Sequence, residues 1–154
     1  MGFFDKIKGA MNAVTGGGAK VSLEFQPPIA HPGHPLHVRI TVVSTGGEIK
    51  SKGVFVDLVG NEVVKLPKGT VANQAADIHA TKASFQQEFQ ISPAFVLGAN
   101  ETKMFEGAIQ LPPALEPSYT GALAKHEWKI QGRMEATGNA PDSGWLDIRI
   151  GRAS

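Results

Sequence analysis

Three histidines lie close together in the sequence and are its best candidates for binding a metal ion. His31, His34 and His37 fall within one short stretch, and imidazole nitrogen is a common ligand of zinc and other transition metals. Pro32 and Pro35 make the spacing between them irregular. On an extended chain, His34 and His37 would point to opposite faces. We therefore interpret all three as solvent-facing turn and strand-edge histidines, and we predict no bound metal.

Other patterns that would indicate catalysis or a cofactor are missing from the sequence. There is no cysteine, which excludes a thiolate nucleophile and a Cys-based zinc site. No Gly-x-Ser-x-Gly elbow, P-loop or Rossmann glycine pattern occurs, and Gly16-Gly17-Gly18 lacks the Lys-Ser/Thr that a phosphate site needs. The carboxylates are scattered and form no evident general acid–base pair. We predict no catalytic residue and no cofactor.

Composition places the chain among ordinary globular domains. Its 154 residues suit one domain, and its net charge of +1 favours neither nucleic acid nor acidic ligands. No apolar run approaches the ~20 residues of a membrane span. The first residues also lack the apolar core of a signal peptide. The expected location is therefore the cytoplasm.

Residues 1–15 have the pattern of a short amphipathic helix. At about 100° per residue, one apolar stripe is formed by the candidate interaction residues Phe3, Phe4, Ile7, Met11 and Val14. The stripe could dock on its own domain, dock on a second copy, or lie on a membrane surface with Lys6 and Lys8 near the head groups. A disordered tail is the remaining alternative. Residues 16–18 would be a glycine hinge, and residues 19–154 the folded domain.

Residues 124–136 give the clearest structural signal in the chain. Apolar or small residues occupy the even positions and polar residues the odd ones, which predicts a strand with one buried and one solvated face. Trp128 then needs a second sheet to cover it, and His126 should be buried with its hydrogen bonds satisfied. The opposite face mixes lysine, arginine and glutamate, so we expect it to be solvated rather than to bind nucleic acid.

Further short strands are predicted, separated by Gly- and Pro-rich turns. The pattern supports roughly seven to nine strands and an all-β sandwich of two antiparallel sheets. Residues 60–80 show little periodicity, so we predict a long loop there with a short strand at Val63–Leu66. Ahead of the long strand lies a proline corner, in which Pro112 and Pro117 would interrupt strand pairing and Tyr119 would bury its ring.

The order of these pieces resembles the N-terminal half of the arrestin fold. The matching segments are the Pro32-Gly33 turn before LHVRITVV, then GVFVDLVG, FVLGANETKMFEGAIQLP, LEPSY and the long strand. The start of the chain, with its Phe- and Lys-rich segment and GGAKV, is similar to bacterial sporulation-control proteins of this superfamily. Those proteins have two sandwiches, whereas this sequence accounts for one. The 60–80 segment matches neither group.

The resemblance implies a non-catalytic adaptor or scaffold that binds other proteins through strand edges and loops. The helix at residues 1–15 would serve self-association or membrane-surface contact. The alternative is a sandwich that binds a small ligand or carbohydrate, for which Trp145 is the one candidate aromatic because Trp128 and Tyr119 are predicted to be buried. An enzyme is the weakest of the three hypotheses.

Overall fold

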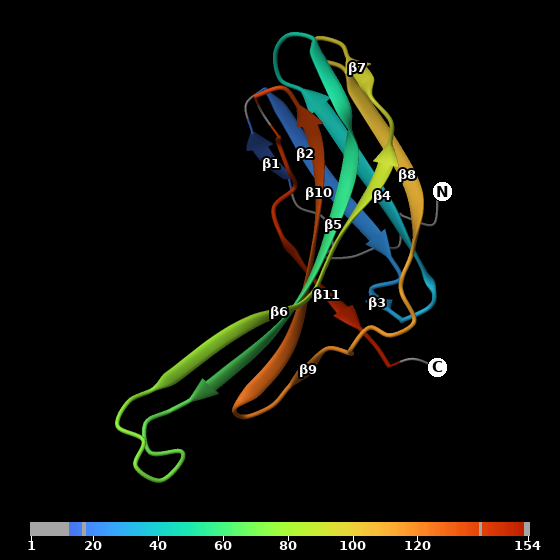
Figure 1. Cartoon of the computed structure of the whole chain (residues 1–154). Coiled ribbons are helices and arrows are strands. Elements are labelled where there is room, and N and C mark those ends of the chain that lie inside the picture. Colours follow the sequence, from blue (N-terminus) through green and yellow to red (C-terminus); the bar gives the residue numbers. More distant parts are fainter. Residues whose placement is uncertain (1–12, 17, 139, 153–154) are drawn as a thin grey trace.

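The computed structural model describes residues 13–16, 18–138 and 140–152, and these residues form strands and turns. Within these ranges there is no helix long and apolar enough to cross a membrane. Two sheets pack face to face, and part of the larger sheet projects beyond the sandwich as an arm (Figure 1).

The smaller sheet has four antiparallel strands in the order β1-β2-β4-β8. They are β1 (Ala13–Gly16), β2 (Ala19–Gln26), β4 (Pro35–Ser44) and β8 (Thr102–Gln110). Alternation builds this sheet: Val21, Leu23 and Phe25 of β2 are buried, while the residues between them are partly exposed. Pro27 and Pro28 follow β2 directly and end it, because proline cannot donate to a strand ladder.

The larger sheet has seven strands, with the path β3-β11-β10-β5-β6, while β7 pairs with β5 and β9 with β10. Its strands are β3 (Ile29–Ala30), β5 (Ile49–Leu66), β6 (Ile78–Ser92), β7 (Phe95–Leu97), β9 (Tyr119–Thr120), β10 (Ala124–Ala136) and β11 (Leu146–Ile150). The β3–β11 pair is parallel and the other pairs are antiparallel. The sequence predicted two antiparallel sheets. That prediction is wrong at one edge of the larger sheet, where β3 and β11 are parallel.

The hydrophobic core lies between the inner faces of the two sheets. The larger sheet contributes Val54, Val56 and Leu58 from β5, and Trp128, Ile130 and Met134 from β10. The smaller sheet contributes a matching row from β2 and β4: Val21, Leu23, Phe25, Leu36, Val38, Ile40 and Val42. Gly132 allows the sheets to approach closely, because a Cβ there would lie 3.1 Å from Ile40.

The sequence predicted some elements accurately and others wrongly. The long strand occupies residues 124–136, and its even positions from His126 to Met134 are buried, as expected. The prediction for residues 60–80 is partly right: β5 includes the predicted strand at Val63–Leu66 and residues 67–77 form a loop, but β5 also covers residues 60–62 and β6 already starts at Ile78. Residues 13–16 form β1 rather than the end of a helix and the start of a hinge. The described residues contain eleven strands, several of them very short, against the seven to nine expected.

Candidate interaction surface: a projecting arm

An arm built from parts of β5, β6 and β10 and from the short β9 extends past the end of the sandwich (Figure 1). We define it as residues 61–66 of β5, 78–83 of β6, their connecting loop 67–77, and residues 119–127 with β9 and the start of β10. Every residue of β6 from Ile78 to Ser84 is exposed. The arm is therefore held by its strand ladders rather than by a second layer.

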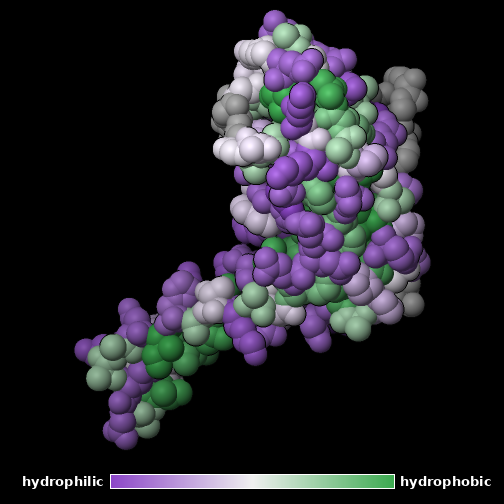
Figure 2. All heavy atoms as spheres, turned by 45° about the horizontal axis from the view of Figure 1, so that its top comes forward, coloured by the Kyte–Doolittle hydropathy of each residue, from purple (hydrophilic) through white to green (hydrophobic). Residues whose placement is uncertain are grey.

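One face of the arm continues the inner, core-facing side of the larger sheet. Paired residues project to the same side of a sheet, and the register runs from Trp128 opposite Gly60 to Ala124 opposite Val64. On this side the arm carries a row of apolar residues: Val64, Leu66, Ile78, Ala80 and Ala124. We call this row the arm face. Ile78 is 46% exposed, and Figure 2 shows hydrophobic side chains gathered on the arm.

The loop at the tip of the arm is ordered by its own side chains. The Gln74 amide donates to the carbonyls of Leu66 and Ala76, both at 2.8 Å, and its oxygen accepts from the Val71 amide at 3.2 Å. Asp77 accepts a further bond from the Lys68 amide at 2.7 Å. These bonds close the hairpin, so the arm face is presented by a defined tip.

The base of the arm is a bulge packed beneath a tryptophan. Phe85 pairs with Gly60 but Ala83 pairs with Asn61, which leaves Ser84 as an extra residue on β6. The Trp128 ring lies over Gly60 and near Phe85, with ring centroids 5.5 Å apart. Its indole N–H donates to the Glu116 carbonyl at 3.0 Å. The bulge thus marks the point where the packed core ends and the arm begins.

A serine and a histidine are joined across the same base. Ser84 Oγ lies 2.6 Å from His126 Nε2, and His126 Nδ1 lies 3.2 Å from the Pro117 carbonyl oxygen. Because a carbonyl can only accept, Nδ1 carries the proton, and Nε2 accepts the Ser84 hydroxyl. His126 is 3% exposed, as predicted for a buried and satisfied histidine.

This is the tautomer found in serine–histidine catalytic pairs, but its surroundings favour a structural role. Such pairs orient the imidazole with a third group, often a carboxylate that also stabilises the imidazolium. Here Nδ1 meets a backbone carbonyl, which supplies no negative charge, and the imidazole is closed to solvent. The pair ties three segments together: the β6 bulge, β10 and the proline corner.

The proline corner meets the rest of the fold through its backbone. The Leu111 and Pro112 carbonyls each accept a hydrogen bond from the Gly33 amide at 3.1 Å, and the Pro117 carbonyl accepts one from His126 Nδ1. Ser118 exchanges bonds with Ile150 of β11. The predicted burial of Tyr119 is wrong: the residue is 52% exposed in β9. Its partner across the ladder, His126, occupies the buried position instead.

Of the three clustered histidines, His31 and His34 lie between β3, the edge of the larger sheet opposite the arm, and β4, whereas His37 lies within β4 of the smaller sheet. His31 Nδ1 lies 3.2 Å from the Arg152 carbonyl oxygen, and the rings of His31 and His34 meet edge to face at 6.4 Å. No group of three or more His, Cys, Asp or Glu side chains suited to a metal ion occurs in the described part of the chain.

The outer face of the larger sheet holds a charged network beside an exposed tryptophan. Arg133 binds Asp57 (Nε to Oδ2, 2.8 Å), Glu135 (3.2 Å) and Glu88, and lies over the Phe55 ring at 4.7 Å. Partial burial alone would lower the pKa of Arg133. The hydrogen bond to Asp57 and the surrounding carboxylates more than offset that effect, so this pKa lies above its ordinary value. Trp145, predicted as the one candidate aromatic, is 47% exposed and lines a groove beside this network.

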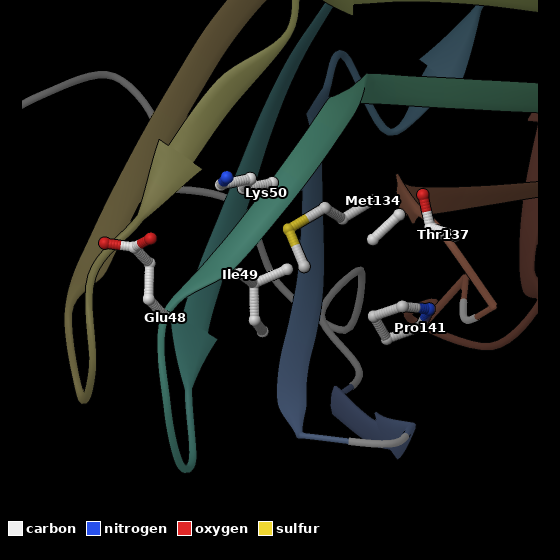
Figure 3. A pocket seen from close by; sticks show the side chains of 7 residues that line it. Glu48, Ile49, Lys50, Met134, Thr137 and Pro141 are labelled. Carbon is white, nitrogen blue, oxygen red and sulfur yellow. The ribbon is translucent and has the colours of Figure 1, made fainter.

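A second groove, of about 370 Å³, lies at the end of the sandwich away from the arm (Figure 1), and Figure 3 shows the residues that line it. Glu48, Ile49 and Lys50 line it from the start of β5, and Met134, Ala136, Thr137 and Pro141 from the end of β10 and the segment after it. Glu48 and Lys50 are its only charged groups. We assign this groove no chemistry.

The predicted interaction residues of the N-terminal segment fall largely outside the part of the chain that the structure describes. Phe3, Phe4, Ile7 and Met11 lie outside the described residues, and Val14 pairs with Val21 in β1. Sequence reasoning placed a short strand at Val63–Leu66 but did not predict the arm face. The further signal that could have indicated it was a second apolar start at Ile78.

Comparison with known proteins supports the fold. No family model matches the chain, and no curated protein matches it in sequence. Among solved structures, the chain is similar to the crystal structure of Spo0M, a sporulation control protein from Bacillus subtilis, with a TM-score of 0.61 and 16% identity. The match covers 87% of this chain and 49% of that one, so this chain spans about half its length. The predicted likeness to sporulation-control proteins with an arrestin-like fold is confirmed at the level of the fold.

Proposed function

We propose that the chain is a non-catalytic, arrestin-like adaptor or scaffold module that binds an extended segment of a partner protein along its arm. The observation that carries this proposal is the arm face, where the core-facing side of the larger sheet continues past the smaller sheet and leaves Ile78 46% exposed. Its likeness in fold to a sporulation control protein supports a regulatory rather than a metabolic role.

The edge of the arm supplies the second half of the binding mode. β6 is the last strand on the path of its sheet, and among the described residues it pairs with β5 alone. Its other edge can therefore accept an added strand, and the new backbone hydrogen bonds would provide affinity. Ile78 and Ala80 project on the arm face two positions apart. We infer that the partner segment alternates apolar and polar residues, so that its apolar side chains lie against these two.

The test compares two surface substitutions that add the same charge. Ile78→Lys changes the arm face, and Met104→Lys, at a position 62% exposed on β8, is the matched control. Each folded full-length chain is immobilised and exposed to extract of its own host. We expect the wild type and the Met104 variant to retain the same proteins, and the Ile78 variant to lose at least one of them. Identical retention by all three chains would refute the arm as the binding surface.

A structural measurement accompanies the capture experiment. Once a partner is in hand, binding should slow hydrogen exchange at alternate amides of β6 between residues 78 and 84, because an added strand bonds every second residue of an edge. Protection confined to other strands would place the partner elsewhere and contradict the proposed mode.

Residues 1–15 remain the proposed site of self-association or membrane-surface contact, through Phe3, Phe4, Ile7 and Met11. A chain that starts at Ala13 keeps β1 and removes these residues. We expect this shortened chain to scatter light as a smaller particle than the full chain, or to lose cosedimentation with anionic liposomes. Equal behaviour of both chains in both measurements would refute this part of the proposal.

A further inference from the structure

The groove beside Trp145 has the size and position of a small-molecule site. It has a volume of about 380 Å³, within the ~300–1,000 Å³ common for ligand pockets. It lies on the outer face of the larger sheet and is lined by Asp57, Gln86, Gln87, Glu88, Gln131, Arg133 and Trp145. We call it the Trp145 groove. None of its lining residues belongs to the arm face.

The polar floor of the groove is held in place by contacts within the protein. Asp57 and Gln131 are cross-strand partners, and the Gln131 amide donates to Asp57 at 3.0 Å. Arg133 holds the same carboxylate at 2.8 Å, and the Arg133 and Asp57 side chains are only 16% and 18% exposed. Such groups lose little conformational freedom when a ligand binds.

The charges of the groove select against anionic ligands. Arg133 is the one cation of the network, and Asp57, Glu88 and Glu135 surround it, so a phosphate or sulfate would meet excess negative charge. The amides of Gln86 and Gln131 are neutral and can both donate and accept, and the Gln131 oxygen has no partner among the described residues.

Trp145 completes the arrangement with an apolar plate. This residue is 47% exposed and lines the groove together with these amides, so its indole supplies apolar aromatic surface there. A ligand suited to the groove must combine a flat C–H surface with hydroxyl groups that donate and accept. We propose that the Trp145 groove binds a neutral saccharide, with one sugar ring stacked on the indole and its hydroxyls bonded to Gln131 and Asp57.

The two tryptophans of the chain allow a direct test. In the full-length, ¹⁵N-labelled protein, each indole N–H gives its own NMR signal, and Trp128 is buried with its N–H bonded to Glu116. The probes are maltotetraose, cellotetraose and chitotetraose. Inorganic phosphate and an N-acetyl-lysine amide serve as the anionic and cationic comparisons. We expect at least one tetrasaccharide to shift the Trp145 signal in a saturable way and to leave the Trp128 signal unchanged.

Substitutions then place the ligand in the groove. Trp145→Ala should weaken binding of the active tetrasaccharide tenfold or more, and Gln131→Ala about five- to tenfold, from loss of a stacking face and of one hydrogen bond. Met104→Ala on the opposite sheet should have no effect. The inference is overturned if no tetrasaccharide shifts the Trp145 signal, if binding survives Trp145→Ala, or if phosphate or the lysine amide binds at the groove in place of sugar.

Discussion

The ring of Trp128 lies so close over Gly60 that a Cβ at residue 60 would come within 2.9 Å of ring atoms Cζ3 and Cη2. These two residues face each other across the β5–β10 ladder at the place where the core ends and the arm begins. Glycine is therefore required at this position by the bulk of its partner, in a stretch of chain whose conformation is otherwise ordinary for a strand.

Gly60→Ala should destabilise the fold. The added methyl group would meet the Trp128 ring and also approach Ser84 Oγ to 3.0 Å, and overpacking of this kind costs ~1–3 kcal/mol. Gly46→Ala is the matched control, because a Cβ there has no atom within 4 Å. Denaturant unfolding would measure both. A loss at residue 60 no larger than at residue 46 would contradict the close packing described.

Ser84 and His126 should be energetically coupled. Their hydrogen bond is 2.6 Å long and joins the β6 bulge to β10. We expect the coupling free energy between Ser84→Ala and His126→Phe to be ~0.5–1.5 kcal/mol in a double-mutant cycle of unfolding free energies. His126→Phe should also cost more than Ser84→Ala, because it leaves the Pro117 carbonyl without its donor. Strict additivity of the two substitutions would refute the tie.

Trp128 and Tyr119 should differ sharply when each is truncated to alanine. Trp128 is 2% exposed and fills the base of the arm, so Trp128→Ala should lower the unfolding free energy by ~3–5 kcal/mol. Tyr119 is 52% exposed, and Tyr119→Ala should lower it by less than ~1 kcal/mol. Thermal and denaturant unfolding of both variants checks the contrast. A large loss of unfolding free energy in Tyr119→Ala would contradict the exposed position of Tyr119 and favour the burial predicted from the sequence.

Gln74→Ala should loosen the tip of the arm and leave the sandwich intact. The substitution removes three hydrogen bonds that close the 67–77 loop, all of them outside the core. We expect faster hydrogen exchange in residues 68–77 and a global unfolding free energy within ~0.5 kcal/mol of the wild type. Unchanged exchange at the tip would show that these bonds do not order the loop.

Lys129 should make stability depend on pH in the alkaline range. Its hydrogen bond to Asp147, at 2.6 Å, raises its pKa above the ordinary value of 10.5, and partial desolvation opposes this. A raised folded-state pKa gives stability that is fully present below the unfolded pKa and is lost as pH rises through the folded pKa. Unfolding from pH ~9 to ~11.5 should therefore show the wild type losing its advantage over Lys129→Met. A difference constant with pH would contradict the pairing.

Strands that have one face on the core and the other in solvent could be predicted from the sequence. In β10, every second residue from His126 to Met134 is buried and the others are partly exposed, so the pattern of burial matches the pattern of residue types. The same holds for β2 and β4. Alternation with a period of two arises where one face of a strand is buried and the other is solvated. These strands have two such faces along their length.

The arm could not be predicted from alternation, because the part of β6 that belongs to the arm has no buried face. From Ile78 to Ser84 every residue is exposed, so selection for alternate burial has no core to act on. The extra residue at Ser84 also shifts the alternation of β6 relative to its first half. Residues 60–80 therefore lacked periodicity, although those that belong to β5 and β6 (60–66 and 78–80) pair in a ladder.

The corner shows a different limit of sequence reasoning. An aromatic ring after three prolines suggested a buried tyrosine, but Tyr119 in β9 is exposed although it pairs with the buried His126. The buried groups at the corner are Leu115 and His126, and the indole N–H that binds the corner comes from Trp128. Which of several nearby large side chains fills such a space depends on the three-dimensional path of the corner.

The arm begins where the core-facing rows of β5 and β10 end, at the Gly60–Trp128 contact. Adding or deleting residues two at a time in both β5 and β6 beyond that contact would keep each side chain on its present side. The length of the arm can thus change by two residues in each strand at a time, while the core of the sandwich stays the same.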